Sequence, residues 1–207
     1  PETTRIPIED GPAGRAFLLE ALVRILETQL EGCVLVELEP QADERGFFAR
    51  TWCAREFAEA GLPAHLVQCS ISRNSATGTT RGLHFQKPPS REGKLVRCAR
   101  GAFVDVVVDI RPASPTFLQH LSIELDEDNG RGIYVPPGFA HGFQTQRDET
   151  DVLYHMTDYF APEQASGLRW DDPALGIRWP GAPSVIGERD ASYPDLDIEW
   201  LRSLRWD

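Results

Sequence analysis

Short runs of β-forming residues, separated by clusters of turn residues, occupy the middle of this chain. The predicted strands are Lys94–Ala99, Phe103–Ile110, Leu121–Leu125, Gly132–Val135, Gly142–Gln146 and Asp151–Met156. Several short strands between turn clusters are typical of an all-β sandwich or barrel. In Phe103–Ile110 the alternation is clear only at the ends, which suits a strand that is covered on both faces.

Few segments have helical patterning. Ala54–Ala60 is predicted as a short helix because Gly61 and a nearby proline stop it. Apolar positions in Ala13–Leu26 fit a helix, although a strand could begin near Val23. The C-terminal stretch Leu196–Trp206 is predicted to dock on the domain.

The length of 207 residues fits one domain, which we place at residues 23–207 after an N-terminal extension of residues 1–22. The net charge of −11 argues against nucleic acid and anionic membranes as partners, since both bind basic surfaces. No apolar run reaches the roughly 18 residues of a membrane span. The four cysteines stand singly, which indicates buried, reduced thiols in a cytoplasmic protein: Cys33, Cys53, Cys69 and Cys98.

One motif at the end of a predicted strand points to the cupin barrel. Pro136–His141 matches the second half-motif of that barrel, PxGxxH, whereas the first half offers His84-Phe-Gln86 where metal-binding cupins have a His-x-His pair. A stable transition-metal site usually needs three or four side-chain ligands. His84 and His141 alone fall short, so we expect neither a metal nor another cofactor.

Polar side chains surround His84 in the sequence. Arg81, Gln86, Lys94 and Arg97 lie nearby. Arginine binds phosphate oxygens in a bidentate manner, and a lysine stabilises a developing enolate through its charge. This set suits a substrate with phosphates and a carbonyl. Simple strand alternation would turn at most one of Arg81 and His84 into a barrel, so local geometry must decide the other.

Seven ordered motifs, spread over roughly residues 23–194, resemble the dTDP-4-dehydrorhamnose 3,5-epimerase family. They are Asp43-Glu-Arg45-Gly-Phe-Phe, Arg81-Gly-Leu-His84-Phe-Gln, Gly93-Lys94-Leu-Val-Arg97, Asp105-Val-Val-Val-Asp-Ile-Arg111, Ser114-Pro-Thr-Phe, Pro136-Pro-Gly-Phe-Ala-His141-Gly-Phe and Trp170-Asp-Asp-Pro-Ala-Leu-Gly-Ile-Arg-Trp-Pro180. The resemblance implies a metal-free cupin jelly roll with a few short helices around it. It also implies a homodimer that inverts C3 and C5 of a dTDP-linked 4-keto-6-deoxy sugar.

The same resemblance implies roles for individual residues. His84 matches the base that removes the proton next to the C4 ketone, and Asp190 matches the carboxylate paired with it. Tyr159 matches the acid on the opposite face, and Lys94 matches the cation beside the sugar oxygen. The nucleotide and its diphosphate would be held by Arg45, Gln68, Arg81, His141 and Arg189.

Elementary chemistry agrees with these roles. A neutral imidazole can take a weakly acidic proton next to a ketone only if the enolate is stabilised at once. A carboxylate behind the ring fixes its tautomer and favours the imidazolium that forms. Inversion needs a second acid on the opposite face, and a tyrosine can be that acid while it stays neutral.

Departures from the family pattern leave other functions open. Arg50, the pair Cys69-Ser70 and Ala165 replace residues common in the family, near the nucleotide or the partner chain. The alternatives are an epimerase that acts at C3 or C5 only, and a 3,4-ketoisomerase, which would rely on a pair of close histidines. A third is a non-catalytic cupin that binds a sugar nucleotide, for which a matched base and acid would be superfluous.

Overall fold

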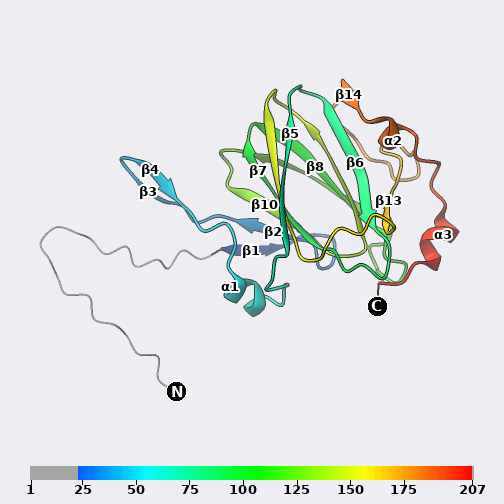
Figure 1. Ribbon diagram of the computed structural model, residues 1–207, viewed down its shortest axis with the longest axis horizontal. Helices are drawn as coiled ribbons and strands as arrows, with labels where there is room; N and C mark the ends of the chain where they lie inside the picture. The colour runs from blue at the N-terminus through cyan, green and yellow to red at the C-terminus, as the bar shows by residue number, and fades with distance from the viewer. Residues whose placement is uncertain (1–22, 207) are drawn as a thin grey trace, which may run out of the picture.

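The fold consists of two facing β-sheets with three short helices at the periphery (Figure 1). The structure, a computed structural model, describes residues 23–206. Its strands are β1 (Arg24–Glu27), β2 (Val34–Glu37), β3 (Gln41–Asp43), β4 (Gly46–Phe48), β5 (Gln68–Asn74), β6 (Thr79–Gln86), β7 (Lys94–Arg100), β8 (Ala102–Asp109), β9 (His120–Asp126), β10 (Arg131–Val135), β11 (Phe139–Thr145), β12 (Thr150–Met156), β13 (Ala165–Gly167) and β14 (Val185–Ile186). The helices are α1 (Ala54–Glu59), α2 (Glu188–Ala191) and α3 (Ile198–Ser203).

The two large sheets have different strand orders. The first runs β1-β2-β10-β7-β12-β5, and the second runs β13-β6-β11-β8-β9, with β14 added to β6. All the neighbours along these two paths pair antiparallel. Within the described chain, the sheets face each other without closing into one continuous barrel. The predicted class, an all-β cupin-like jelly roll, is confirmed.

The main hydrophobic core lies between the sheets and follows from strand alternation. Val96 and Cys98 on β7 meet Phe103 on β8 and Phe143 on β11 in this layer. The residues that alternate with these along the strands face outward. Those of the second sheet are covered by the C-terminal segment, including Leu201 on α3, which confirms the predicted docking.

The strand predictions hold, with one shift and one change of type. The run predicted at Gly142–Gln146 begins at Phe139, because the proline-rich turn before it ends sooner than the sequence suggested. The helix predicted at Ala13–Leu26 is wrong at its end, where the alternative, a strand beginning near Val23, is confirmed: Arg24–Glu27 forms strand β1 paired with β2. Its earlier part and the extension at 1–22 lie outside the described residues. That the extension is separate from a single domain at 23–207 stays a prediction.

A two-stranded hairpin of β3 and β4 projects from the sandwich (Figure 1, upper left). Its tip residue Arg45 pairs with Asp43 of the same hairpin, while Phe47 and Phe48 are 66% and 61% exposed.

The cysteines are unpaired, but their predicted burial is wrong for Cys69, which is exposed on edge strand β5. None of the helices in the described part is long and apolar enough to cross a membrane.

Candidate active site

An irregularity in strand β6 turns two polar side chains into the same cavity. On the neighbouring strand β11, His141 pairs with His84 and Phe143 pairs with Arg81, so one extra residue of β6 is accommodated between the two pairs. Such a bulge breaks the alternation of side chains. Arg81 and His84 both line the cavity as a result, which answers the question that alternation left open.

Gly82 makes this bulge possible. Its φ is +111°, and a Cβ there would lie 2.6 Å from the Cα of Gly142, so a side chain is excluded by both conformation and space. Its amide also donates a hydrogen bond of 3.0 Å to Asp190 Oδ2. The bulge therefore holds the carboxylate as well as placing the histidine.

His84 and Asp190 form the pair that the sequence predicts. Asp190 Oδ1 lies 2.7 Å from His84 Nε2, and the Arg189 guanidinium lies 3.1 Å from the same nitrogen. A carboxylate only accepts and a guanidinium only donates, so one Nε2 cannot serve both. The shorter contact assigns the hydrogen to Nε2, which leaves Nδ1 with a lone pair. His84 is 34% exposed in the cavity wall, so that lone pair is available to a substrate.

Asp190 is ionised in this setting. Burial favours its neutral form, but the hydrogen bonds from His84 and the Gly82 amide outweigh burial and lower the pKa of the carboxyl below its ordinary value. A stable negative charge behind the ring stabilises the imidazolium that forms when His84 accepts a proton.

Lys94 reaches the cavity from strand β7 in the facing sheet. Its ammonium lies 3.4 Å from Glu92 Oε1, and Glu92 Oε2 accepts a hydrogen bond of 2.6 Å from Gln86 Nε2. The side chain of Glu92 is only 8% exposed. Sequence reasoning missed this carboxylate, although its spacing of two from Lys94 places both on one face of an extended chain.

The floor of the cavity holds a second histidine–aspartate pair. His141 Nε2 lies 2.7 Å from Asp105 Oδ1, and both side chains are buried. Their strands, β11 and β8, are adjacent. The ring of Tyr154, on strand β12 of the facing sheet, packs edge-on against His141 with 6.1 Å between ring centroids.

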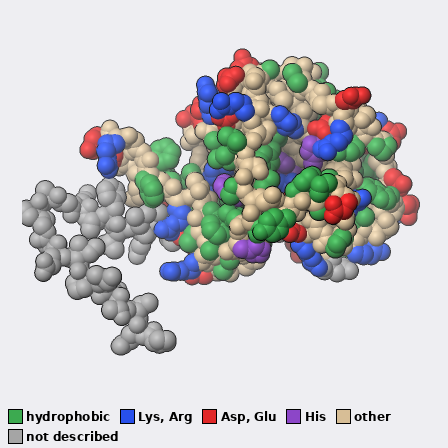
Figure 2. Space-filling view, viewed as in Figure 1, with side chains coloured by type: hydrophobic (Ala, Val, Ile, Leu, Met, Phe, Trp, Pro, Cys, Tyr) green, Lys and Arg blue, Asp and Glu red, His purple; other side chains and the backbone are tan. Residues whose placement is uncertain are grey.

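The cavity has two contiguous compartments that share Ser70, His84, Lys94 and Met156. The smaller one, of about 270 Å³, which we call the inner compartment, also includes Arg81, His141 and Tyr154. The outer one, of about 400 Å³, also includes Gln68, Gln86, Glu92, Phe160 and Arg189. Figure 2 shows histidine and basic side chains gathered around a hollow on the face of the molecule. The two compartments thus combine an acid–base centre with a larger adjoining space that polar side chains line.

The structure separates the predicted acid Tyr159 from the inner compartment. Tyr159 is 66% exposed and lines neither compartment. Tyr154, which sequence reasoning missed, lies in the inner compartment with His84. Strand alternation was the signal that could have found it, because Val152, Tyr154 and Met156 share the inward face of β12.

Two basic residues near the motifs lie away from the cavity. Arg45 is at the tip of the projecting hairpin. Arg97 turns to the outer face of its sheet, where it donates hydrogen bonds to the carbonyls of Gly130 and Val36. Of the predicted nucleotide-holding residues, Gln68, Arg81, His141 and Arg189 do line the cavity within this chain, and Arg45 does not.

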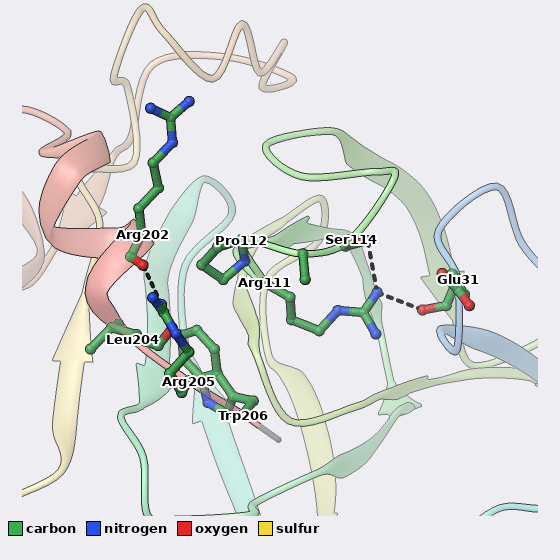
Figure 3. A pocket seen from close by; sticks show the side chains of 9 residues that line it. Glu31, Arg111, Pro112, Ser114, Arg202, Leu204, Arg205 and Trp206 are labelled. Atoms are coloured by element: carbon green, nitrogen blue, oxygen red, sulfur yellow. Dashed lines mark hydrogen bonds between the residues drawn. The ribbon is translucent and has the colours of Figure 1, made fainter.

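A different depression, of about 640 Å³, is lined by residues close to the C-terminus. Figure 3 shows that its arginines do not converge: Arg111 points to Glu31 and Ser114, Arg202 points away, and Arg205 lies against Trp206. Arg111 also pairs with Asp109, and Arg202 with Glu199. Because these arginines pair with other groups and point apart, they do not form a shared binding site for a ligand in this depression.

No group of three or more histidine, cysteine, aspartate or glutamate side chains suited to a metal occurs in the part of the chain that the structure describes. His84 and His141 each direct Nε2 at a carboxylate instead.

Sequence comparison identifies the family. The sequence profile of dTDP-4-dehydrorhamnose 3,5-epimerase matches residues 27–197. The chain belongs to this family. A relative from Sinorhizobium fredii named dTDP-4-dehydrorhamnose 3,5-epimerase is 45% identical over 155 residues, which are 74% of this chain and 80% of the relative.

Solved structures of epimerases resemble the fold closely. The enzyme from Legionella pneumophila, in complex with dTDP-4-keto-L-rhamnose, has a TM-score of 0.80 and 37% identity, covering 86% of this chain and 96% of its own. A variant of a 3'-monoepimerase from Streptomyces bikiniensis, in complex with dTDP, has a TM-score of 0.79 and 26% identity, covering 86% and 89%. That variant replaces one histidine and one tyrosine, which lie seventy positions apart.

Proposed function

We propose that this epimerase family member inverts C3 and C5 of a dTDP-4-keto-6-deoxyhexose. One observation carries the proposal: His84 and Tyr154 line one compartment from facing sheets. Asp190 is paired with His84, and Lys94 lines the same compartment from the sheet that holds Tyr154. A base and an acid on two sides of a bound ring are what inversion next to a ketone requires.

The chemistry follows from these positions. His84 Nδ1 takes the proton from a carbon next to the ketone, and the electron pair moves onto the ketone oxygen as an enolate. The ammonium of Lys94 stabilises that oxygen by its charge. Collapse of the enolate takes a proton from the Tyr154 hydroxyl onto the opposite face of the same carbon, and the second carbon reacts in the same way.

Tyr154, rather than Tyr159, is our proposed acid. Burial, together with the negative charge of Asp105, raises the pKa of Tyr154 above its ordinary value against the opposing effect of Arg81. Its hydroxyl therefore stays protonated at neutral pH. The His84–Tyr154 spacing of seventy residues equals that of the two substitutions in the Streptomyces variant, whereas Tyr159 is five residues further on.

Epimerisation at a single carbon is the second candidate, favoured by the similarity to a 3'-monoepimerase. A ketoisomerase was expected to need two close histidines, and His141 is the register partner of His84. The histidine pair alone therefore does not separate the two reactions. The tyrosine in the facing sheet favours inversion.

Incubation with dTDP-4-keto-6-deoxyglucose in D2O tests the function. We expect deuterium at both C3 and C5 with inverted configuration at each carbon, read by NMR. Deuterium at one carbon alone would select the single-centre enzyme. Incorporation at neither carbon would contradict the proposal for this substrate, and binding without exchange would favour the non-catalytic cupin.

The outer compartment is the proposed nucleotide site. Gln68 and Arg189 lie on its wall, and Arg81 lines the adjoining inner compartment. Phe160, 57% exposed at the rim, offers a flat apolar face on which a base can stack. Gln68 Oε1 accepts a hydrogen bond of 2.7 Å from the Phe160 amide, so the polar and aromatic parts of this site are joined.

A homodimer would explain the projecting hairpin. Phe47 and Phe48 on β4 are largely exposed, which is costly for side chains of this size unless a second surface covers them. Arg45, between β3 and β4, would then be delivered to the nucleotide site of the partner chain. In this way the prediction that Arg45 holds the nucleotide stands, although the residue is far from the cavity of its own chain.

Replacing Phe47 and Phe48 together by serine should shift the protein toward monomer, because it removes the apolar surface that drives association. Sedimentation velocity over a range of concentrations measures the shift. Val185→Ser, at another exposed apolar position, is the matched control and should leave the distribution unchanged. An unaltered dimer in the double variant would exclude the hairpin from the interface.

A cytoplasmic location stays a prediction, drawn from the acidic charge and the unpaired cysteines. The chemistry as proposed uses only side chains and calls for no cofactor.

A further inference from the structure

Proton return creates a problem that His84 and Tyr154 cannot solve alone. Each inversion leaves a phenolate at Tyr154, and a second inversion on the same bound sugar needs that phenolate to be protonated again. His84 is a third exposed and can release its proton to solvent. Tyr154 is partly buried and lines the compartment proposed to hold the sugar, so a bound sugar would cover its hydroxyl. That hydroxyl makes no hydrogen bond within the described chain.

Of the groups that contact Tyr154 or act on it by charge, one is a suitable proton source. Three charged or titratable side chains act on it: His141 by ring contact, and Asp105 and Arg81 by their charges. Arg81 donates through Nε to Asn74, and a guanidinium does not give up its proton. Asp105 accepts from His141. An imidazole is the one group of the three that exchanges protons near neutral pH.

Asp105 is arranged to support a proton on His141. Its Oδ1 binds His141 Nε2, while its Oδ2 is buried without a hydrogen-bond partner among the described residues. A carboxylate behind an imidazole orients the ring and stabilises the imidazolium that forms. The pair thus repeats the His84–Asp190 arrangement on the other side of the same compartment.

Building on the proposed function, we propose that the His141–Asp105 pair recharges Tyr154 between inversions. The imidazolium of His141 gives its Nδ1 proton to the Tyr154 phenolate, directly or through a water in the cavity. His141 becomes neutral. Because it is only 4% exposed, it regains a proton through the open cavity after the product has left, and its one stored proton serves the second inversion. The proton that His84 removed from carbon goes to solvent in turn, so the cycle balances. Asp105 is a positioning residue, because it acts through His141.

The test compares two outcomes of one enolate in D2O. Return of deuterium from His84 gives exchange with retained configuration, whereas delivery by Tyr154 gives inversion. In Asp105→Asn we expect the ratio of retained exchange to inversion to rise roughly tenfold or more. This ratio is set after the substrate is bound, so weaker binding or partial unfolding lowers both outcomes and leaves the ratio unchanged.

Two further variants keep the test decisive. His141→Asn should raise the same ratio, and it replaces the first variant if Asp105→Asn does not fold. His155→Asn is the matched control: His155 neighbours Tyr154 on β12 but faces away from the cavity, so the wild-type ratio is expected. The double variant Asp105→Asn with Tyr154→Phe should have nearly the same ratio of retained exchange to inversion as Tyr154→Phe alone, since both substitutions act on one step.

The possible failures are distinct. If the wild type inverts but both variants keep its ratio, or lose exchange and inversion equally, the relay is wrong and the proposed function stands. If the wild type shows neither exchange nor inversion, the proposed function fails and the relay with it.

Discussion

Replacing His84 by asparagine is expected to abolish deuterium incorporation at C3 and C5 while dTDP still binds. The imidazole supplies the only proposed base, and general bases contribute about 10²–10⁴-fold to rate. In our proposal the outer compartment holds most of the nucleotide, so the affinity for dTDP should change little. Exchange measured by NMR and dTDP affinity measured by calorimetry give the two readouts.

Asp190→Asn tests the same pair by removing the negative charge that is paired with His84. Because Nε2–H then faces an amide rather than a carboxylate, the imidazolium loses its stabilising charge, and activity should fall by up to roughly 10⁴-fold. His120→Asn, on strand β9 and outside the cavity, is the matched control. Retained exchange in His84→Asn would remove the histidine from the role of base.

Tyr154→Phe is expected to separate deprotonation from inversion. The phenylalanine keeps the packing against His141 but cannot donate a proton, so inversion should fall by about 10²–10⁴-fold. Exchange with retained configuration should continue, because His84 can return a deuteron to the face from which it took the proton. NMR of the recovered sugar distinguishes the two products.

Tyr159→Phe is the decisive comparison for the acid. Tyr159 is exposed and does not line either compartment, so its hydroxyl should matter within about a factor of two. The reverse result, with Tyr159→Phe inactive in inversion and Tyr154→Phe active, would restore Tyr159. It would then follow that the segment after β12 closes over the substrate.

Much of the fold followed from local pattern. Runs such as Phe103–Ile110 were found because strand alternation and turn residues are properties of neighbouring positions. For Arg24–Glu27 the local pattern left helix and strand both open, because its identity as a strand depends on pairing with β2. The hairpin of β3 and β4 was likewise visible only as a motif, and not as a projection from the body.

The site was predicted unevenly for a similar reason. The motifs named His84, Lys94 and Asp190, and the structure brings all three to one cavity. The choice between Tyr154 and Tyr159 depends on where strand β12 ends: Tyr154 lies within it and faces the cavity, whereas Tyr159 lies beyond its end. Glu92, just before a strand, and Asp105, within one, were given no role because a carboxylate looks solvated until its burial is known.

The sequence by itself determined the class of fold and the family, and it named His84 as the candidate base, because these depend on residue types at fixed spacings along the chain. Only the tertiary structure decided which side chains share the compartment. His84 and Asp190 are separated by 106 residues, and they meet because a bulge at Gly82 turns the histidine inward and offers its amide to the carboxylate. Such a meeting depends on the path of the backbone in space, which residue spacing alone does not specify.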